Sequence, residues 1–162
     1  MRRGRRLAVD VGKARVGLAI SDQDGILATP FETVQRQATA ADTATKVRQA
    51  IDDFVFIEGY VGLPLSLSGA ATPSTADALL VAYAIADAVD FEIRLVDERL
   101  TTVSAAANLR IAGKNAKNSR SIIDQEAAAI ILEQALSGEK ATGNQPGTAL
   151  SSHARPAEKS PD

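Results

Sequence analysis

The segment from Leu7 to Ile20 constrains the fold more than any other part of the sequence. Its first five residues, Leu-Ala-Val-Asp-Val, predict a short β-strand, because they include β-branched and small apolar residues and have no helical period. A turn of glycine and bases follows (Gly12, Lys13 and Arg15), and then a second apolar run. This order predicts a β-hairpin with positive charge at its turn.

Asp10 stands inside the first of these strands, between two valines. A carboxylate is costly to bury among such neighbours unless it meets a cation, a hydrogen-bond donor or a metal. An Asp-x-Gly sequence at the end of a strand is also common in simple turns, where the aspartate caps the following backbone. The hairpin therefore indicates either an acid that lies next to a phosphate-binding site or an ordinary turn that the aspartate caps.

The size and composition of the chain narrow the possible chemistry. Its 162 residues are enough for one domain with a sizeable core. The absence of cysteine excludes disulfides and thiolate metal sites, and the only histidine, His153, lies in a polar C-terminal segment. Any catalysis therefore rests on carboxylates, lysines, hydroxyls or backbone groups. No apolar run is long enough to cross a bilayer and no signal peptide is evident, so we expect a cytoplasmic protein without a membrane partner.

Basic side chains are concentrated in two segments, although the formal net charge is −2. Residues 1–15 carry six bases and one acid, and residues 94–120 carry six bases and two acids. The second segment ends in a polar loop that contains Lys114, Lys117 and Arg120. If the two segments meet in space, they suit a polyanion such as a nucleic acid.

The remaining pattern predicts an α/β domain. Expected strands are 7–11, 16–20, 26–29 (stopped by Pro30), 57–62 and 92–96; expected helices are 40–54, from 74 or 75 to 89, from 101 or 102 to 111, and 121–136. Three strands joined by short turns, followed by βαβ units, give a mixed five-stranded sheet, antiparallel and then parallel, with helices on both faces. We expect this domain to span residues 1–137, and residues 138–162 to form a disordered tail.

Three acidic positions are expected to converge in this fold. Ligands in such sheets gather at the carboxyl ends of the parallel strands, where Asp10 lies and where Asp97 and Glu98 follow their strand. Strand alternation lets only one of the adjacent pair face the site. Asp124 belongs to the apolar face of the last helix, although an acid there can also simply favour the helix dipole. That face also contains Ala127, Ala128, Ile131 and Ala135, whereas Glu126 and Glu133 are expected in solvent.

Three carboxylates from two strand ends and one helix face would make an oxygen-only pocket. Hard cations such as Mg²⁺ prefer such ligands, together with water and substrate phosphate. Two such ions about 4 Å apart can activate a water and stabilise the leaving oxygen of a phosphodiester. The lack of a usable histidine is compatible with this chemistry, because metal-bound water can replace a protein base.

Four stretches, in this order, carry a resemblance to a known family. They are DVGKARVG at Asp10–Gly17, GLPLSLSG at Gly62–Gly69, DERLTT at Asp97–Thr102 and IDQEAAAIIL at Ile123–Leu132. Together they resemble the YqgF/RuvX family of the RNase H-like (RuvC-type) superfamily, over about residues 6–136. The sequence departs from the family pattern at Gly59 and Tyr60, in a strand that is usually aliphatic, and at 71–73, where Gly-Pro is common.

The resemblance implies an RNase H-like fold and a nuclease that depends on Mg²⁺ or Mn²⁺. It implies a role in maturation of the 5′ end of pre-16S rRNA and, by kinship, in the resolution of Holliday junctions. The family's acidic positions map onto Asp10, Glu98 and Asp124, as catalytic residues and metal ligands. Its nucleic-acid contacts map onto Lys13, Arg15, Arg99, Thr101 and Thr102.

Four functions remain open at the level of sequence. The first is a nuclease acting on structured pre-rRNA, and the second is a resolvase acting on branched DNA, which needs a symmetric dimer to cut two strands. Both a monomer and a homodimer are therefore possible. The third is an ATPase of the actin/hexokinase type, whose first phosphate loop has a similar pattern, and the fourth is an RNA-binding factor without catalysis.

Overall fold

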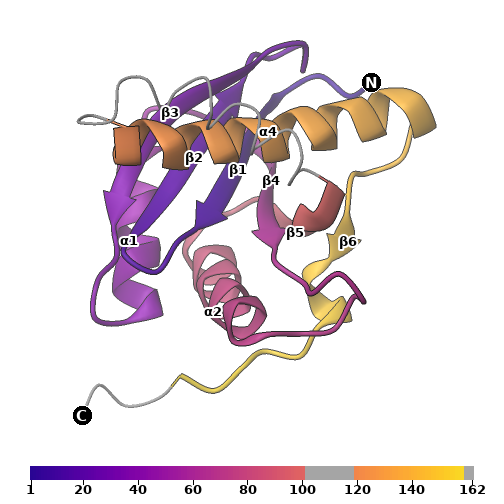
Figure 1. Ribbon diagram of the computed structural model, residues 1–162. Coiled ribbons are helices and arrows are strands. Elements are labelled where there is room, and N and C mark those ends of the chain that lie inside the picture. Colours follow the sequence, from indigo (N-terminus) through magenta and orange to yellow (C-terminus); the bar gives the residue numbers. More distant parts are fainter. Residues whose placement is uncertain (101–118, 159–162) are drawn as a thin grey trace.

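The computed structural model describes residues 1–100 and 119–158, and a six-stranded sheet lies at its centre (Figure 1). The strand order is β3-β2-β1-β4-β5-β6. The strands are β1 (Arg5–Val11), β2 (Arg15–Ser21), β3 (Ala28–Gln35), β4 (Phe56–Leu63), β5 (Glu92–Asp97) and β6 (Thr148–Ala149). The first three pair antiparallel, whereas β1, β4 and β5 run parallel, which confirms the predicted mixed α/β sheet. The short sixth strand was not predicted.

Strand β3 is longer than the sequence indicates, because it continues through Pro30. It lies at the edge of the sheet, where a proline costs little because its missing N–H can face solvent. The pairing also shifts here: Ala19 is opposite Pro30, whereas Leu18 is opposite Glu32, so β3 contains one extra residue, a β-bulge. The expected end at residue 29 is therefore wrong.

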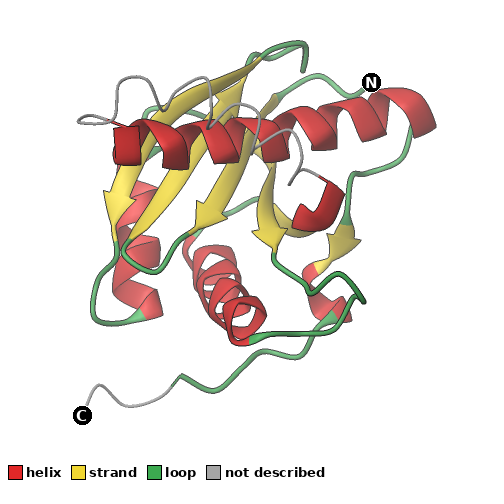
Figure 2. Ribbon diagram, in the orientation of Figure 1, coloured by secondary structure: helices red, strands yellow, loops and turns green. Residues whose placement is uncertain are grey.

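Helices cover both faces of the sheet, as predicted (Figure 2). Helices α1 (Ala40–Ala50) and α2 (Pro73–Ala88) pack on one face, and α4 (Ser119–Thr142) crosses the other. Helix α2 begins earlier than expected, because Thr72 rather than residue 74 or 75 is its N-cap and forms a capping box with Thr75. Helix α1 ends before 54, at residue 50. The helix expected to begin at 101 or 102 lies outside the described residues.

The two faces of the sheet differ in the size of their side chains. Leu7, Val9 and Leu18 point toward α1 and α2 in the larger hydrophobic core. Ala8 and Ala19 alternate with them and face α4, which contributes buried alanines of its own. Small residues on both sides let a helix lie close to a sheet. The long helix α4 is therefore positioned mainly by contacts with the first three strands.

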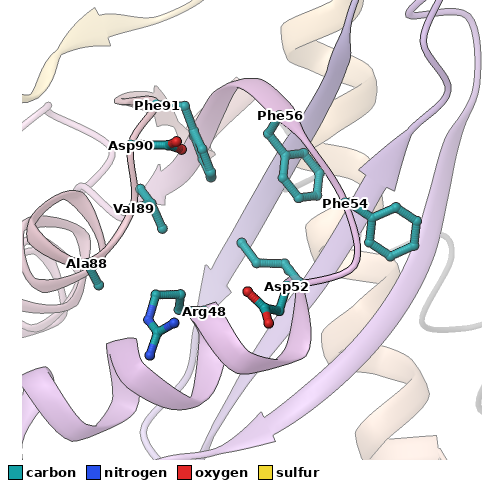
Figure 3. Close-up of a pocket in the computed structure, with 9 residues that line it drawn as sticks. Arg48, Asp52, Phe54, Phe56, Ala88, Val89, Asp90 and Phe91 are labelled. Carbon is teal, nitrogen blue, oxygen red and sulfur yellow. The ribbon is translucent and has the colours of Figure 1, made fainter.

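The chain's four phenylalanines gather at the edge of the larger core, away from the carboxyl ends of the parallel strands. Successive ring centroids of Phe31, Phe54, Phe56 and Phe91 lie 5.4, 6.1 and 5.4 Å apart. Three of these rings line a cavity of about 450 Å³ beyond the ends of α1 and α2, with Arg48 at its margin (Figure 3). None of the predicted catalytic acids lines this cavity.

A cluster of ion pairs joins the N-terminal segment and β1 to β4 and the last turns of α4. The side chain of Arg6 is 0% exposed and forms an ion pair with Glu139, which is 3% exposed. Arg2 joins Glu139 to Glu58, whose carboxylate also accepts a hydrogen bond of 2.9 Å from the hydroxyl of Tyr60. Because Arg6, Glu58 and Glu139 are removed from water, their charges must be paired for the fold to tolerate them.

Residues 143–158, here called the C-terminal arm, are ordered against the domain, so the expected disordered tail from 138 is wrong for the described part. Helix α4 continues to Thr142, β6 pairs with β5, and a 3-10 helix, η3 (Leu150–Ser152), follows. The arm then passes α2 toward the start of α1 (Figure 1). Its partners are distant in sequence: Tyr83 donates to the carbonyl of Leu150, Arg155 pairs with Asp87 at 2.8 Å, and Glu158 accepts from the Ala40 amide.

No helix in the described ranges 1–100 and 119–158 combines the length and hydrophobicity that a transmembrane span requires.

Candidate active site

Asp10 occupies a gap in the α4 face of the sheet that two glycines create. Its direct neighbour on β2 is Gly17. On the other side, the register that pairs Val9 with Val61 places Gly62 of β4 next to Asp10. Because neither neighbouring strand presents a side chain at this level, groups from other elements can approach the carboxyl group of Asp10.

Glu98 fills the space over Gly62. It is the first residue of the 3-10 helix η1 (Glu98–Leu100), which directly follows β5. A Cβ atom at Gly62 would lie 2.5 Å from Oε1 of Glu98, so a larger residue there would push this carboxylate away from its present position. The side chains of Glu98 and Asp10 are hydrogen-bonded to each other. The structure thus brings Glu98 to Asp10, while Asp97 forms an ion pair of 2.6 Å with Arg99.

Asp124 reaches the same place from α4. The helix backbone rests directly on β2: a Cβ atom at Gly17 would lie 1.9 Å from the carbonyl oxygen of Asp124. The carboxylate is half-buried and accepts a hydrogen bond of 2.8 Å from Nε of Arg15. The expectation of an inward Asp124 and of a solvated Glu133 agrees with the structure, whereas Glu126 is half-buried.

The electrostatics of the site reflect crowded acids. Burial, the negative charge of Glu98, its hydrogen bond and the charge of Asp124 raise the pKa of Asp10 to about 8. Burial and the charge of Asp97 also raise the pKa of Glu98, against the effect of its hydrogen bond with Asp10. At neutral pH Asp10 therefore holds a proton and donates it to Glu98. Two crowded carboxyl groups that share a proton can instead bind a cation, which neutralises their charge.

The donor set fits a hard divalent cation in part. Asp10 and Glu98 supply oxygen ligands of the type that Mg²⁺ and Mn²⁺ prefer, and Asp124 is close enough to act on Asp10 by its charge. The Asp124 carboxylate is turned to Arg15. Accordingly, no group of three acidic or histidine side chains in the described part of the chain has metal-binding geometry. Asp124 would have to leave Arg15 to become a third ligand.

The predicted nucleic-acid contacts are distributed unevenly. Lys13 is exposed in the β1–β2 turn. Arg15 and Arg99 are each paired with an acid, Asp124 and Asp97, and Arg99 also donates to the carbonyl of Leu67 at 3.3 Å. The other predicted contacts lie outside the described residues: Thr101, Thr102, Lys114, Lys117 and the side chain of Arg120.

Arg36 supports the basic turn and was not predicted from the sequence. Arg36, just after β3, donates to the carbonyl of Gly12 at 3.0 Å and pairs with Asp77 of α2 at 2.8 Å. Its backbone amide also donates to the carbonyl of Ala14 at 3.0 Å. This position carries no local signal, because its partners come from a turn and a helix that are distant in the sequence.

Solved structures similar to this chain define its class. A structure of Thermus thermophilus RuvC in complex with a Holliday junction substrate matches with a TM-score of 0.57 and 16% identity, over 88% of this chain and 98% of RuvC. A second structure of Thermus thermophilus RuvC gives a TM-score of 0.54 and 14% identity, over 88% and 99%. The fold, with its acids at the sheet end, is therefore RNase H-like, of the RuvC type.

The sequence comparisons specify the family within this class. Residues 4–138 match the family RuvX, described as Holliday junction resolvase. A protein of Leifsonia xyli subsp. xyli, provisionally named a pre-16S rRNA nuclease, is 52% identical over 91% of this chain and 94% of its own length. A Streptomyces coelicolor protein with the same name is 50% identical over 91% and 88%. The chain belongs to the RuvX (YqgF) family.

Proposed function

We propose that this chain is a nuclease that uses Mg²⁺ or Mn²⁺ to hydrolyse phosphodiester bonds of structured RNA, in maturation of the 5′ end of pre-16S rRNA. The observation that carries the proposal is the meeting of Asp10 and Glu98 over two glycines, with Asp124 beside them, in an RNase H-like fold. The family membership and the names of the relatives support the nuclease activity and its substrate. Such a role belongs in the cytoplasm.

Each side chain has a distinct part in this proposal. Asp10 and Glu98 would hold the cation, and Asp124, which pairs with Arg15 here, would be the third ligand. A bound divalent cation would polarise the phosphate and lower the pKa of an attacking water. We expect Arg15, once free of Asp124, and exposed Lys13 to contact the substrate backbone near the acids. Arg36 holds the turn that carries both bases.

A cleavage assay with purified protein tests the proposal. The substrates are an RNA duplex that contains the 5′ leader of pre-16S rRNA and, separately, a four-way DNA junction, each with Mg²⁺ or Mn²⁺. We expect cleavage of the leader RNA by the wild type and loss of at least about 100-fold in rate for Asp10→Asn and Glu98→Gln. Asp53→Asn removes an exposed acid outside the site and is the matched control, with an unchanged rate.

A second candidate function is resolution of four-way DNA junctions. The family description and the RuvC structure with a junction favour it. It predicts a homodimer in solution and preferred cleavage of the junction, whereas the first function is compatible with a monomer. Binding of RNA with no cleavage of either the leader RNA or the DNA junction in either metal would refute both nuclease functions, and so would an Asp10→Asn protein as active as the wild type.

A further inference from the structure

A cavity of about 390 Å³ opens next to the acidic site, on the side of β5. It is bounded by Leu63, which follows Gly62, and by Asp97, which precedes Glu98. Strand β6 pairs only with Arg94 and Leu95. The last two residues of β5 are therefore paired with β4 alone, and on their other side they border the cavity. Helix α4 closes it on another side. The cavity thus begins at the two strand ends that carry the site.

The lining of the cavity is mostly aliphatic with a few polar groups. Leu63, Leu65, Leu95 and Val96 supply apolar walls. Gln134 and His153 also line it, and within the described part of the chain neither side chain makes a hydrogen bond. A volume in the range of about 300–1,000 Å³, with apolar walls and a small number of polar groups that fix orientation, is typical of small-ligand sites.

The C-terminal arm forms part of this wall. Pro146, Gly147, Thr148 and His153 all line the cavity, and they lie beyond residue 138, where the match to the RuvX family ends. The arm is fixed here because Arg94 donates to the carbonyl of Pro146 at 2.7 Å, and Tyr83 donates to the carbonyl of His153. The cavity is therefore a built feature of the fold and not a gap beside a loose tail.

We propose that this cavity receives one unstacked nucleobase of the substrate strand, next to the phosphate at the acidic site. The inference rests on the proposed nuclease function. A flipped base needs apolar surfaces for its two faces and hydrogen-bonding groups for its edge. The leucines and Val96 supply the first, and Gln134 and His153, which have no competing partner in the described residues, supply the second. Substrate selection at this position then depends partly on the C-terminal arm.

The only histidine of the chain gives a direct test. In the untagged protein, the imidazole resonances of His153 are followed by proton NMR during titration with the tetranucleotides rU4 and rA4, with EDTA present so that no metal-dependent cleavage occurs. An abasic tetramer with the same phosphates is the reference ligand. We expect a saturable shift of the His153 resonances with at least one of the two base-containing tetramers and none with the abasic tetramer.

Two variants on α4 link this shift to the cavity. Gly138 lines the cavity, and a Cβ atom there meets no heavy atom within 4 Å, so Gly138→Leu adds volume without a backbone clash. It is expected to weaken binding at least tenfold. Gln134→Ala removes a polar contact and is expected to weaken it at least threefold, whereas Ser137→Ala, exposed and outside the cavity, leaves it unchanged.

The outcomes separate this inference from the proposed function. No shift with either base-containing tetramer, an equal shift with the abasic tetramer, or unchanged binding by folded Gly138→Leu and Gln134→Ala would overturn the base-binding cavity. Cleavage of RNA by the same protein would then still stand. Conversely, a base-dependent shift in a protein that cleaves no substrate would retain the cavity and refute the nuclease.

Discussion

Replacing Gly17 by alanine should displace α4 from the sheet at the acidic site. The added Cβ atom would lie 1.9 Å from the carbonyl oxygen of Asp124 and 2.3 Å from its carbonyl carbon. Both are backbone atoms, so no flexible side chain can move aside. An ordinary van der Waals contact begins near 3.4 Å, and the helix and strand must therefore separate locally by about 1.5 Å.

The loss of folding free energy caused by this separation can be estimated from overpacked sites in other proteins. Forcing extra volume into a well-packed contact typically costs about 1–3 kcal/mol, which lowers the melting temperature of a chain of this size by roughly 2–12 °C. The effect on catalysis should be larger, because a misplacement of about 1 Å can reduce a rate about 100-fold. Thermal unfolding and the cleavage rate at a temperature where the variant stays folded measure the two effects separately.

For thermal unfolding, Gly138→Ala is the matched control, because it makes the same glycine-to-alanine change on α4 with no heavy atom within 4 Å of the new Cβ. It should stabilise the protein by about 0.8–1 kcal/mol through helix propensity. A Gly17→Ala protein that melts and cleaves like the wild type would show that α4 does not rest on Gly17, and the account of how Asp124 reaches Asp10 would fail.

Three further predictions concern charge and the C-terminal arm. The raised pKa of Asp10, about 8 against 3.8 unfolded, means that only the unfolded state ionises between these values. The wild type thus loses stability as pH rises from about 4 to 8. At pH 8.5 the melting temperature of Asp10→Asn should be at least about 3 °C above that of the wild type, whereas at pH 3.5 it should not be higher. If the variant and the wild type melted at the same temperature at both pH values, the burial of this acid would be contradicted. Glu139→Ala leaves Arg6 buried without its partner and should lower the free energy of unfolding in urea by about 3–5 kcal/mol, whereas a loss below 1 kcal/mol would show that water reaches Arg6. Tyr83→Phe removes the hydroxyl that holds two carbonyls of the arm, so backbone amides near 150–153 should exchange hydrogen faster, and unchanged exchange would mean that the arm is held elsewhere.

Local patterns were sufficient for much of the fold and for two of the acids. The hairpin from Leu7 to Ile20 follows from apolar runs on either side of a basic turn, and both strands form as expected. The inward face of α4 at Asp124 follows from three- and four-residue spacing. In each case the pattern of apolar residues within a short segment is enough to predict the strand or the buried face of the helix.

The features that could not be predicted from the sequence depend on contacts between distant segments. Alternation alone could not choose between Asp97 and Glu98, because the chain leaves strand geometry at η1 and the choice depends on the empty space above Gly62. The C-terminal arm has no periodic pattern, and its order comes from Tyr83, Asp87 and the start of α1. The pairing of Arg15 with Asp124 is likewise visible only once α4 lies on β2.

Calorimetric titration of Mn²⁺ into the protein at pH 8.5 tests the central claim most directly, because Asp10 is then largely ionised. If Asp10, Glu98 and Asp124 form one cation site, the wild type binds saturably, and Asp10→Asn and Asp124→Asn each bind at least tenfold more weakly, while Asp53→Asn is unchanged. At pH 7 the wild-type heat should also depend on the buffer, because Asp10 must release its proton to the solution. Wild-type affinity in Asp10→Asn, or no saturable binding by the wild type, would contradict the account.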